Sequence, residues 1–154
     1  QKGFDILLRA LQQLPQLKLQ LAGGGEDEMM LRELAKNLDH VNFLGQVDNV
    51  PEFLESCDVI VIPSRYEPFG LVCLEALAAG RPVVVTDVDG LPEQVQGCGL
   101  IVPAEDETAI AEALASLPDS PLETWGKQAK ENKMNDWHRY LQQYQQFFDR
   151  LLSR

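Results

Sequence analysis

Short apolar runs rich in β-branched residues alternate with stretches of helical apolar spacing along most of the chain. The short runs predict strands at 17–21, 41–44, 58–62, 83–86 and 100–102. The helical spacing predicts helices at 4–14, 26–38, 50–56, 70–79, 91–96 and 108–117. Strands that alternate with helices form a parallel sheet covered by those helices. The pattern therefore predicts an α/β fold.

The last part of the chain has a different pattern. Aromatic and aliphatic residues recur with helical spacing from Trp137 to Leu152, and glutamines occupy the opposite face. An amphipathic helix is predicted at about 136–152. Its apolar stripe could pack on its own domain, or it could dock on another domain or a partner, and the pattern leaves both open.

Composition narrows the class of protein. A chain of 154 residues with 45% hydrophobic and 24% charged residues is typical of one globular domain. The formal net charge of −11 argues against nucleic acid as a partner. No apolar run has membrane-spanning length, no signal peptide is visible, and the 3 cysteines are widely spaced. We therefore expect a cytoplasmic protein with reduced thiols.

The residues that could carry chemistry concentrate around the helix predicted at 70–79. Glu67 precedes this helix and Glu75 is its only charged side chain. Because the helix is apolar on nearly every face, we expect it to be buried, and a buried carboxylate is costly without a specific partner. The free amides at 69–72 form an anion site by geometry and dipole, and Glu75 could accept hydrogen bonds from a diol. A ligand is therefore expected to cross the start of this helix.

Three other signals are weaker. The turn at 23–25 is Gly-Gly-Gly between a strand and a helix, so its amides could meet a phosphate or could only make a tight corner. Lys2, at a helix start, could pair with a phosphate or be solvated. Asp87, Asp89 and Glu93 follow a strand, where open α/β sheets bind ligands, but they could equally cap the next helix. No catalytic triad or metal-ligand spacing is present.

One series of motifs closely resembles the signature of the family 4 retaining glycosyltransferases. The series is Ser64-Arg65-Tyr66-Glu67-Pro68-Phe69-Gly70, Glu75-Ala76, Gly80-Arg81-Pro82-Val83-Val84 and Gly90-Leu91-Pro92-Glu93. Other landmarks match in the expected order: Lys2-Gly3-Phe4-Asp5, Gly23-Gly24-Gly25 and Phe43-Leu44-Gly45. The resemblance implies that residues 1–154 are the nucleotide-sugar-binding, Rossmann-like C-terminal half of a GT-B fold. It also implies a longer protein, with the first strand and the N-terminal acceptor domain missing here and the final helix crossing back to that domain.

The resemblance implies a role for each matching position. Lys2 matches the lysine that neutralises the donor diphosphate, and Glu67 matches the glutamate that bonds donor-sugar hydroxyls, so both are catalytic candidates. Glu75 matches the carboxylate that holds the ribose hydroxyls. The other implied donor-binding positions are Gly23, Gly24, Gln46, Val47, Pro68, Phe69, Gly70, Leu71 and Val72. The chain departs from the family at Asp89, where a second glycine commonly precedes Gly90.

The implied activity is transfer of a sugar from a nucleotide diphosphate sugar to an acceptor, with retention of configuration, in polysaccharide or glycoconjugate biosynthesis. No metal or other cofactor is expected, because a lysine and the helix dipole neutralise the leaving group. The expected partners are the nucleotide-sugar donor and the missing acceptor domain. Membrane association is expected only peripherally, through that domain.

Two other functions are alternatives to this one. A non-catalytic nucleotide-sugar-binding module describes the isolated chain if turnover requires the acceptor domain. A GT-B relative of another kind fits less well. An epimerase would need histidines and carboxylates at the cleft, and the sequence shows no such set. A phosphorylase would need a lysine for pyridoxal phosphate, whereas Lys127, Lys130 and Lys133 lie in a polar tail.

Overall fold

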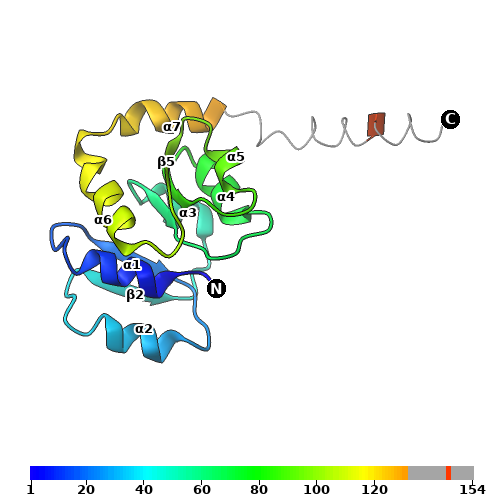
Figure 1. Ribbon diagram of the computed structural model, residues 1–154. Helices are drawn as coiled ribbons and strands as arrows, with labels where there is room; N and C mark the ends of the chain where they lie inside the picture. The colour runs from blue at the N-terminus through cyan, green and yellow to red at the C-terminus, as the bar shows by residue number, and fades with distance from the viewer. Residues whose placement is uncertain (132–144, 147–154) are drawn as a thin grey trace.

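The computed structural model describes residues 1–131 and 145–146, and the strands within this part of the chain are parallel to their neighbours in two separate sheets (Figure 1). The strands are β1 (Leu19–Ala22), β2 (Val41–Gly45), β3 (Ile60–Ile62), β4 (Val83–Thr86) and β5 (Gly99–Val102). β1 pairs with β2, and β4 lies between β3 and β5. The predicted α/β architecture of parallel strands flanked by helices is confirmed.

Helices connect the strands close to where the sequence predicts them. They are α1 (Phe4–Leu11), α2 (Glu28–Leu34), α3 (Val50–Glu55), α4 (Leu71–Ala78), α5 (Leu91–Val95), α6 (Glu107–Ser116) and α7 (Leu122–Glu131), with a 3-10 turn η1 (Leu117–Asp119). The turn η1 and helix α7 were not predicted. The helix predicted at about 136–152 lies outside the described residues except for 145–146, and it stays a prediction. Within the described part of the chain, no helix is both long and apolar enough to cross a membrane.

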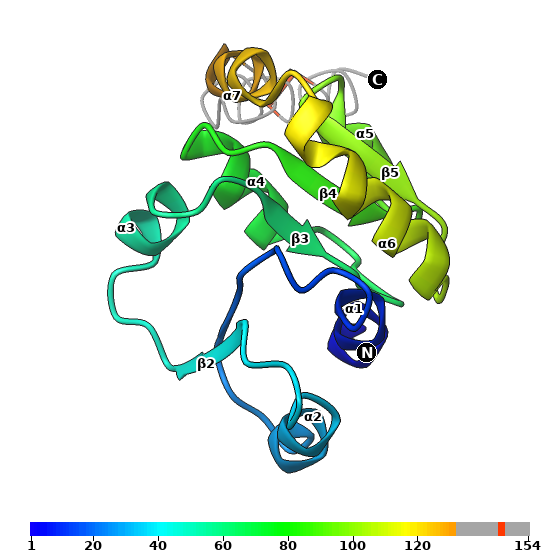
Figure 2. The ribbon, with the colours of Figure 1, turned by 90° about the vertical axis from the view of Figure 1, so that its left-hand side faces the viewer.

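Strand β4 forms the centre of the larger sheet. Val83 and Val85 pack with residues of α3, α4 and α5, whereas Val84 packs with residues of α1 and α6. Figure 2 shows α1 and α6 on one side of this sheet and α3 and α4 on the other. Side chains alternate between the two faces of a strand, so a strand covered on both faces reads as an unbroken apolar run. The three consecutive valines of β4 are explained by its burial on both faces.

Side-chain caps fix the start of two helices. The Asn49 side-chain oxygen accepts a hydrogen bond from the Glu52 amide at 3.3 Å at the start of α3. Asp106 accepts one from the Ala109 amide at 2.9 Å at the start of α6. Each cap satisfies an amide that lacks a partner within its helix.

Helix α7 contacts the end of α4 backbone to backbone. A Cβ atom added at Gly126 would lie 2.7 Å from the Gly80 carbonyl oxygen, and the aliphatic stem of Lys130 covers Gly80. Ala129 is the buried residue of α7. Leu122 and Trp125 are half-buried and most other residues of α7 are polar, so this contact stabilises a helix that its own sequence predicts only weakly.

The smaller sheet, β1–β2, packs less apolar surface. Its buried cluster consists of Leu8, Leu21 and Ala35, and α2 has no buried residue. Figure 1 shows α2 and this sheet at one end of the molecule and α7 at the other. A cavity of about 970 Å³ is lined both by residues 16–22, which include β1, and by residues 56–64, which include β3. We call it the seam cavity.

Candidate functional site

The loop of residues 63–70 connects β3 to α4 and carries Glu67. Its last residue, Gly70, has φ of 74° and is the N-cap residue of α4. A Cβ atom there would lie 2.8 Å from the Leu91 side chain, so both the backbone angle and the space require glycine. The sharp turn brings the Glu67 side chain back to the amide at the start of the helix.

The Glu67 carboxylate is held by three donors. Lys2 Nζ donates to Oε2 at 2.6 Å, and the Ser64 hydroxyl donates to the same oxygen at 3.3 Å. The Gly70 amide donates to Oε1 at 3.3 Å. Two residues that the resemblance implies to be catalytic, 65 positions apart, are thus in direct contact.

These contacts decide the protonation of Glu67. Partial burial raises the pKa of the carboxyl, but the hydrogen bond and charge of Lys2, with the Gly70 amide and the Ser64 hydroxyl, outweigh burial and set the pKa below its usual value. Glu67 is therefore ionised at neutral pH and can accept hydrogen bonds but not donate one.

Lys2 reaches Glu67 because Gly3 allows a close backbone approach. Gly3 has φ of 70°, and a Cβ atom there would lie 1.8 Å from the Pro63 carbonyl oxygen. The Arg65 amide also donates to the Gln1 carbonyl at 2.9 Å. The first residues are thereby packed against the C-terminal end of β3, and no other residue type fits at position 3.

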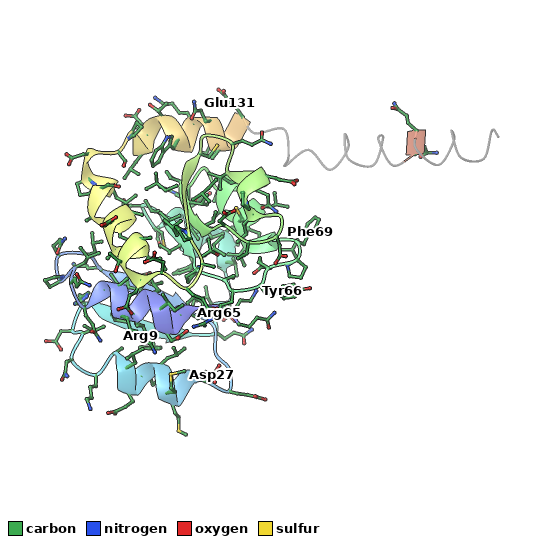
Figure 3. All side chains as sticks on the ribbon, viewed as in Figure 1. Arg9, Asp27, Arg65, Tyr66, Phe69 and Glu131 are labelled. Atoms are coloured by element: carbon green, nitrogen blue, oxygen red, sulfur yellow. The ribbon has the colours of Figure 1, made fainter. Side chains whose placement is uncertain are left out.

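An ion pair ties the same loop to α1. Arg65 donates two hydrogen bonds to the Asp5 carboxylate, at 2.8 and 3.0 Å. The Arg65 hydrogen bond is the main reason why the pKa of Asp5 lies below its usual value. Figure 3 shows Arg65 beside α1, with Tyr66 and Phe69 extending outward from the loop. These two aromatic side chains are 53% and 46% exposed.

Two side chains, one at the end of β4 and one in α5, bind carbonyl groups of the loop. The Thr86 hydroxyl donates to the Ser64 carbonyl at 2.6 Å. The Gln94 amide group donates to the Phe69 carbonyl. Both side chains are buried, so these bonds satisfy polar groups in the interior and fix the two ends of the loop. Sequence reasoning did not identify either residue.

Asp89 binds the loop at its centre. Its Oδ2 accepts a hydrogen bond from the Glu67 backbone amide at 2.8 Å. The residue has φ of 48°, in the left-handed region that favours glycine. The sequence allowed Asp89 to cap α5, but that helix has Gly90 at its N-cap position and no side-chain cap. Its partner in the structure is Glu67 instead.

The expectation that α4 is buried on nearly every face is wrong. Cys73, Ala76 and Leu77 are buried, but Leu71 and Val72 are 57% and 47% exposed, and Glu75 is exposed. Helix α4 packs one face on the sheet and presents its first turn and Glu75 on the surface. Apolar periodicity could not separate the two faces, because apolar residues occupy both. Glu75 therefore carries no burial cost.

The seam cavity collects some of the predicted site residues. Lys2, Val47, Glu67, Val72 and Glu75 line it together, from four separate segments of the chain. Most of its other lining residues are apolar and many belong to β1, β3 and the segments beside them, so the predicted site residues make up a small part of its wall. The predicted positions outside the lining are Gly23, Gly24, Gln46, Pro68, Phe69, Gly70 and Leu71.

The glycine turn after β1 is closed by the backbone. The Gly23 amide donates to the Gly45 carbonyl at 2.7 Å, and Gly23 and Gly45 have φ of 102° and 67°. A Cβ atom at Gly24 would lie 3.2 Å from the Glu28 carboxylate. This part of the turn fits the tight-corner interpretation, since the Gly23 amide is used within the fold.

The three cysteines are free thiols, as predicted. Cys73 and Cys98 are buried, whereas Cys57 is half-buried and lines the seam cavity. Burial raises the pKa of Cys73 to about 12, so that thiol is protonated and unreactive at neutral pH. Within the described ranges, no group of three or more His, Cys, Asp or Glu residues could hold a metal ion.

Comparisons with known proteins agree on one family. The sequence profile described as "Glycosyl transferases group 1" matches residues 1–120. N-acetyl-alpha-D-glucosaminyl L-malate synthase of Bacillus anthracis is 40% identical over 122 residues, which cover 75% of this chain and 32% of that protein.

Solved structures resemble this fold closely. Sucrose-phosphate synthase of Thermosynechococcus elongatus superposes with a TM-score of 0.83 at 35% identity, over 96% of this chain and 43% of that chain. The Anabaena protein HepE in complex with UDP superposes with a TM-score of 0.81 at 27% identity, over 99% of this chain and 46% of that chain. HepE is also solved with UDP-glucose, at a TM-score of 0.76 and 29% identity over 84% of this chain and 40% of that chain. The predicted Rossmann-like GT-B architecture is confirmed, and this chain spans less than half the length of each of these proteins.

Proposed function

The chain belongs to the group 1 glycosyltransferases, and from this premise we propose that it is the donor-binding half of an enzyme that transfers a sugar from a nucleotide diphosphate sugar with retention of configuration. The observation that carries the proposal is the pair of Lys2 and Glu67, 2.6 Å apart at the start of α4, with Glu75 lining the same cavity. A cation, a helix N-terminus and two carboxylates there match the charges and hydroxyls of a nucleotide sugar.

Each group would act on a different part of the donor. The Lys2 side chain is 54% exposed, so its ammonium can reach a diphosphate and offset the charge that develops as the sugar leaves. The ionised Glu67 would accept hydrogen bonds from sugar hydroxyls and orient the ring. Glu75, in the second turn of α4, would accept hydrogen bonds from the ribose diol. None of these steps requires a metal or another cofactor.

HepE, which resembles this chain in structure, has been solved in complex with UDP and with UDP-glucose. These complexes support the proposal that this chain binds a nucleotide-sugar donor. The nucleotide is tested directly by calorimetry on this chain with UDP, GDP, ADP and dTDP sugars. We expect one nucleotide to bind at least about tenfold more tightly than the others, which also raises Tm. Absence of binding to the whole panel would contradict the proposal.

We propose that this chain acts together with an acceptor domain. Turnover and the stereochemistry of transfer must therefore be measured on the protein that carries both. NMR of the first product formed should show the same anomeric configuration as the donor. Glu67→Ala should lower kcat by roughly 100-fold, because the ring loses an orienting group, with little change in donor Kd. An inverted product would refute retention, and wild-type turnover by Glu67→Ala would refute the role of Glu67.

A nucleotide-sugar-binding module without catalysis is the alternative function. It would bind a donor in the calorimetric panel and give no transfer in the complete protein. We also propose a cytoplasmic location, which the free thiols of Cys57, Cys73 and Cys98 favour.

A further inference from the structure

We propose that Asp89 is a positioning residue of the donor site, which holds the backbone of Glu67 so that its carboxylate meets the sugar in one orientation. The proposal rests on the proposed function. It adds a residue at a position where the family commonly has a glycine. It starts from one contact, the 2.8 Å hydrogen bond from the Glu67 amide to Asp89 Oδ2.

The bond fixes the end of Glu67 that the other contacts leave free. Lys2, Ser64 and Gly70 hold the carboxylate, and Asp89 holds the backbone nitrogen. With both ends fixed, the side chain cannot turn without breaking a charge-assisted hydrogen bond, which is among the stronger bonds in proteins. Displacements of about 1 Å at a reacting group can cost about 100-fold in rate.

The backbone of Asp89 adopts a conformation that is costly for a residue with a side chain. Its φ of 48° is unfavourable for a residue with a Cβ atom, and glycine would adopt this angle without strain. Asp and Asn tolerate the left-handed region better than other residues because their short polar side chains bond locally. If the position served only the turn, glycine would serve it better.

The loop has other anchors, and their positions separate them from Asp89. Thr86 and Gln94 bind the carbonyl groups of Ser64 and Phe69, at the two ends of the loop. Those bonds can hold the loop in place without setting the backbone at position 67. Asp89 therefore acts on the orientation of Glu67 rather than on the presence of the loop.

Three substitutions separate positioning from backbone conformation. Asp89→Gly relieves the strain and removes the acceptor, Asp89→Ala keeps the strain and removes the acceptor, and Asp89→Asn keeps an acceptor oxygen. In the protein that carries this chain with an acceptor domain, we expect Asp89→Gly to keep or raise Tm and to lower kcat by about 10- to 100-fold, with donor Kd changed less than about threefold. Asp89→Asn should retain most of kcat, and Asp89→Ala should lose both Tm and kcat.

The hydrogen bond itself is measured without any turnover. Amide exchange followed by NMR on this chain should show the Glu67 amide exchanging at least about tenfold faster in Asp89→Gly than in the wild type and close to the wild-type rate in Asp89→Asn. Asp119→Asn, which removes one exposed negative charge in η1, is the matched control and should change neither the exchange rate nor kcat.

Wild-type kcat in Asp89→Gly would overturn the proposal, as would an unchanged exchange rate at Glu67. Equal loss of kcat in Asp89→Gly and Asp89→Asn would also overturn it, because the conservative variant must rescue a positioning role. If the wild type binds no nucleotide sugar, the proposed function fails, while the exchange rate still decides whether Asp89 holds Glu67.

Discussion

The two sheets of this molecule differ in sequence and in packing: β1 and β2 mix polar with apolar residues, whereas β3, β4 and β5 are almost entirely apolar. In the β3–β5 sheet, β4 is buried along its whole length and covered by helices on both faces. In the β1–β2 sheet, β2 alternates between half-buried and exposed residues and α2 buries none. The candidate site therefore lies between a well-packed half, built on the β3–β5 sheet, and a loosely packed half, built on the β1–β2 sheet.

This division assigns different parts of the site to different halves. Glu67 and Glu75 stand on the loop and helix that follow β3, and their supports come from the well-packed half and from α1. Val47 and the glycine turn belong to the β1–β2 half, and Val47 lines the seam cavity. Because the family resemblance implies that the loop at 45–47 meets the base, we expect the sugar and phosphate groups of a donor to meet a rigid surface and the base to meet a more adaptable one.

The largest expected effect is on the packing of the well-packed half. Leu77→Ala on α4 removes a side chain with no exposed surface and should cost about 2–5 kcal/mol in the free energy of unfolding. Leu34→Ala on α2, where the side chain is half-buried, should cost about 1 kcal/mol. Urea unfolding of the two variants measures both, and equal losses would contradict the division into two halves.

The second effect concerns the seam. Among the described residues β1 and β3 each pair along one edge only, and both line the seam cavity. The Gln1 carbonyl already bonds the Arg65 amide at the end of β3. Fusing a segment of about five apolar residues ahead of Gln1 should add a strand that joins the two sheets. Burial would exceed the ordering cost by roughly 2 kcal/mol, which raises Tm by roughly 4–8 °C.

The control for this extension carries aspartate at alternate positions of the same segment. A charged side chain cannot be buried among leucines without a partner, so the control should leave Tm unchanged. If both segments raise Tm equally, the gain does not come from the seam.

A third and smaller effect compares nucleotide contacts on the two sides of the seam. Glu75→Ala should weaken nucleotide binding by about 10- to 100-fold, because a charged acceptor of ribose hydroxyls is lost. Gln46→Ala should change Kd less than about twofold, since the family resemblance implies that the base meets the backbone around Gly45, Gln46 and Val47. Calorimetry measures both, and unchanged affinity in Glu75→Ala would remove that residue from the site.

The smallest effect is the response to acid. Asp5, whose pKa is lowered first by Arg65, and Glu67, whose pKa is lowered by Lys2 against the effect of burial, have ordinary values of 3.8 and 4.5. Because their folded-state pKa values lie below these, their stabilisation is complete above about pH 5 and is lost as the pH falls through the folded-state values. The contribution of each pair should stay near or below about 1 kcal/mol, as both cations are partly exposed.

Urea unfolding at pH 7 and pH 3 tests this acid response. Asp5→Asn should reduce the difference in stability between the two pH values. Glu28→Gln, which breaks the exposed ion pair with Arg32 on α2, should reduce it less. A larger effect of Glu28→Gln would place the acid-sensitive contacts in the loosely packed half.

The sequence predicted elements wherever local pattern alone determines them. Val83–Thr86 was bounded correctly, because a strand buried on both faces leaves an unbroken β-branched run. Helix α7 was missed, because it is mostly polar, contains Gly126 and depends on a backbone contact with Gly80 that no local pattern encodes. The split between the two sheets was not foreseen either, since strand order is a property of the assembled fold.

The same limit applies to the site. Glu67 and Glu75 were found by their spacing around a helix start, although the burial inferred for Glu75 was wrong. The bond between Asp89 and Glu67 spans 22 positions, and that between Arg65 and Asp5 spans 60. Contacts of this range follow from tertiary packing, so the sequence could point to Asp89 as an unusual residue but not to its partner.

The unequal burial of the three cysteines has a practical consequence. Cys73 and Cys98 are closed off in the interior, whereas Cys57 lines the seam cavity and is half-buried. A maleimide fluorophore should therefore label the folded protein at one position without any engineered cysteine. Its emission would report on solvent entry between the two sheets, so the packing between the two halves could be followed by fluorescence.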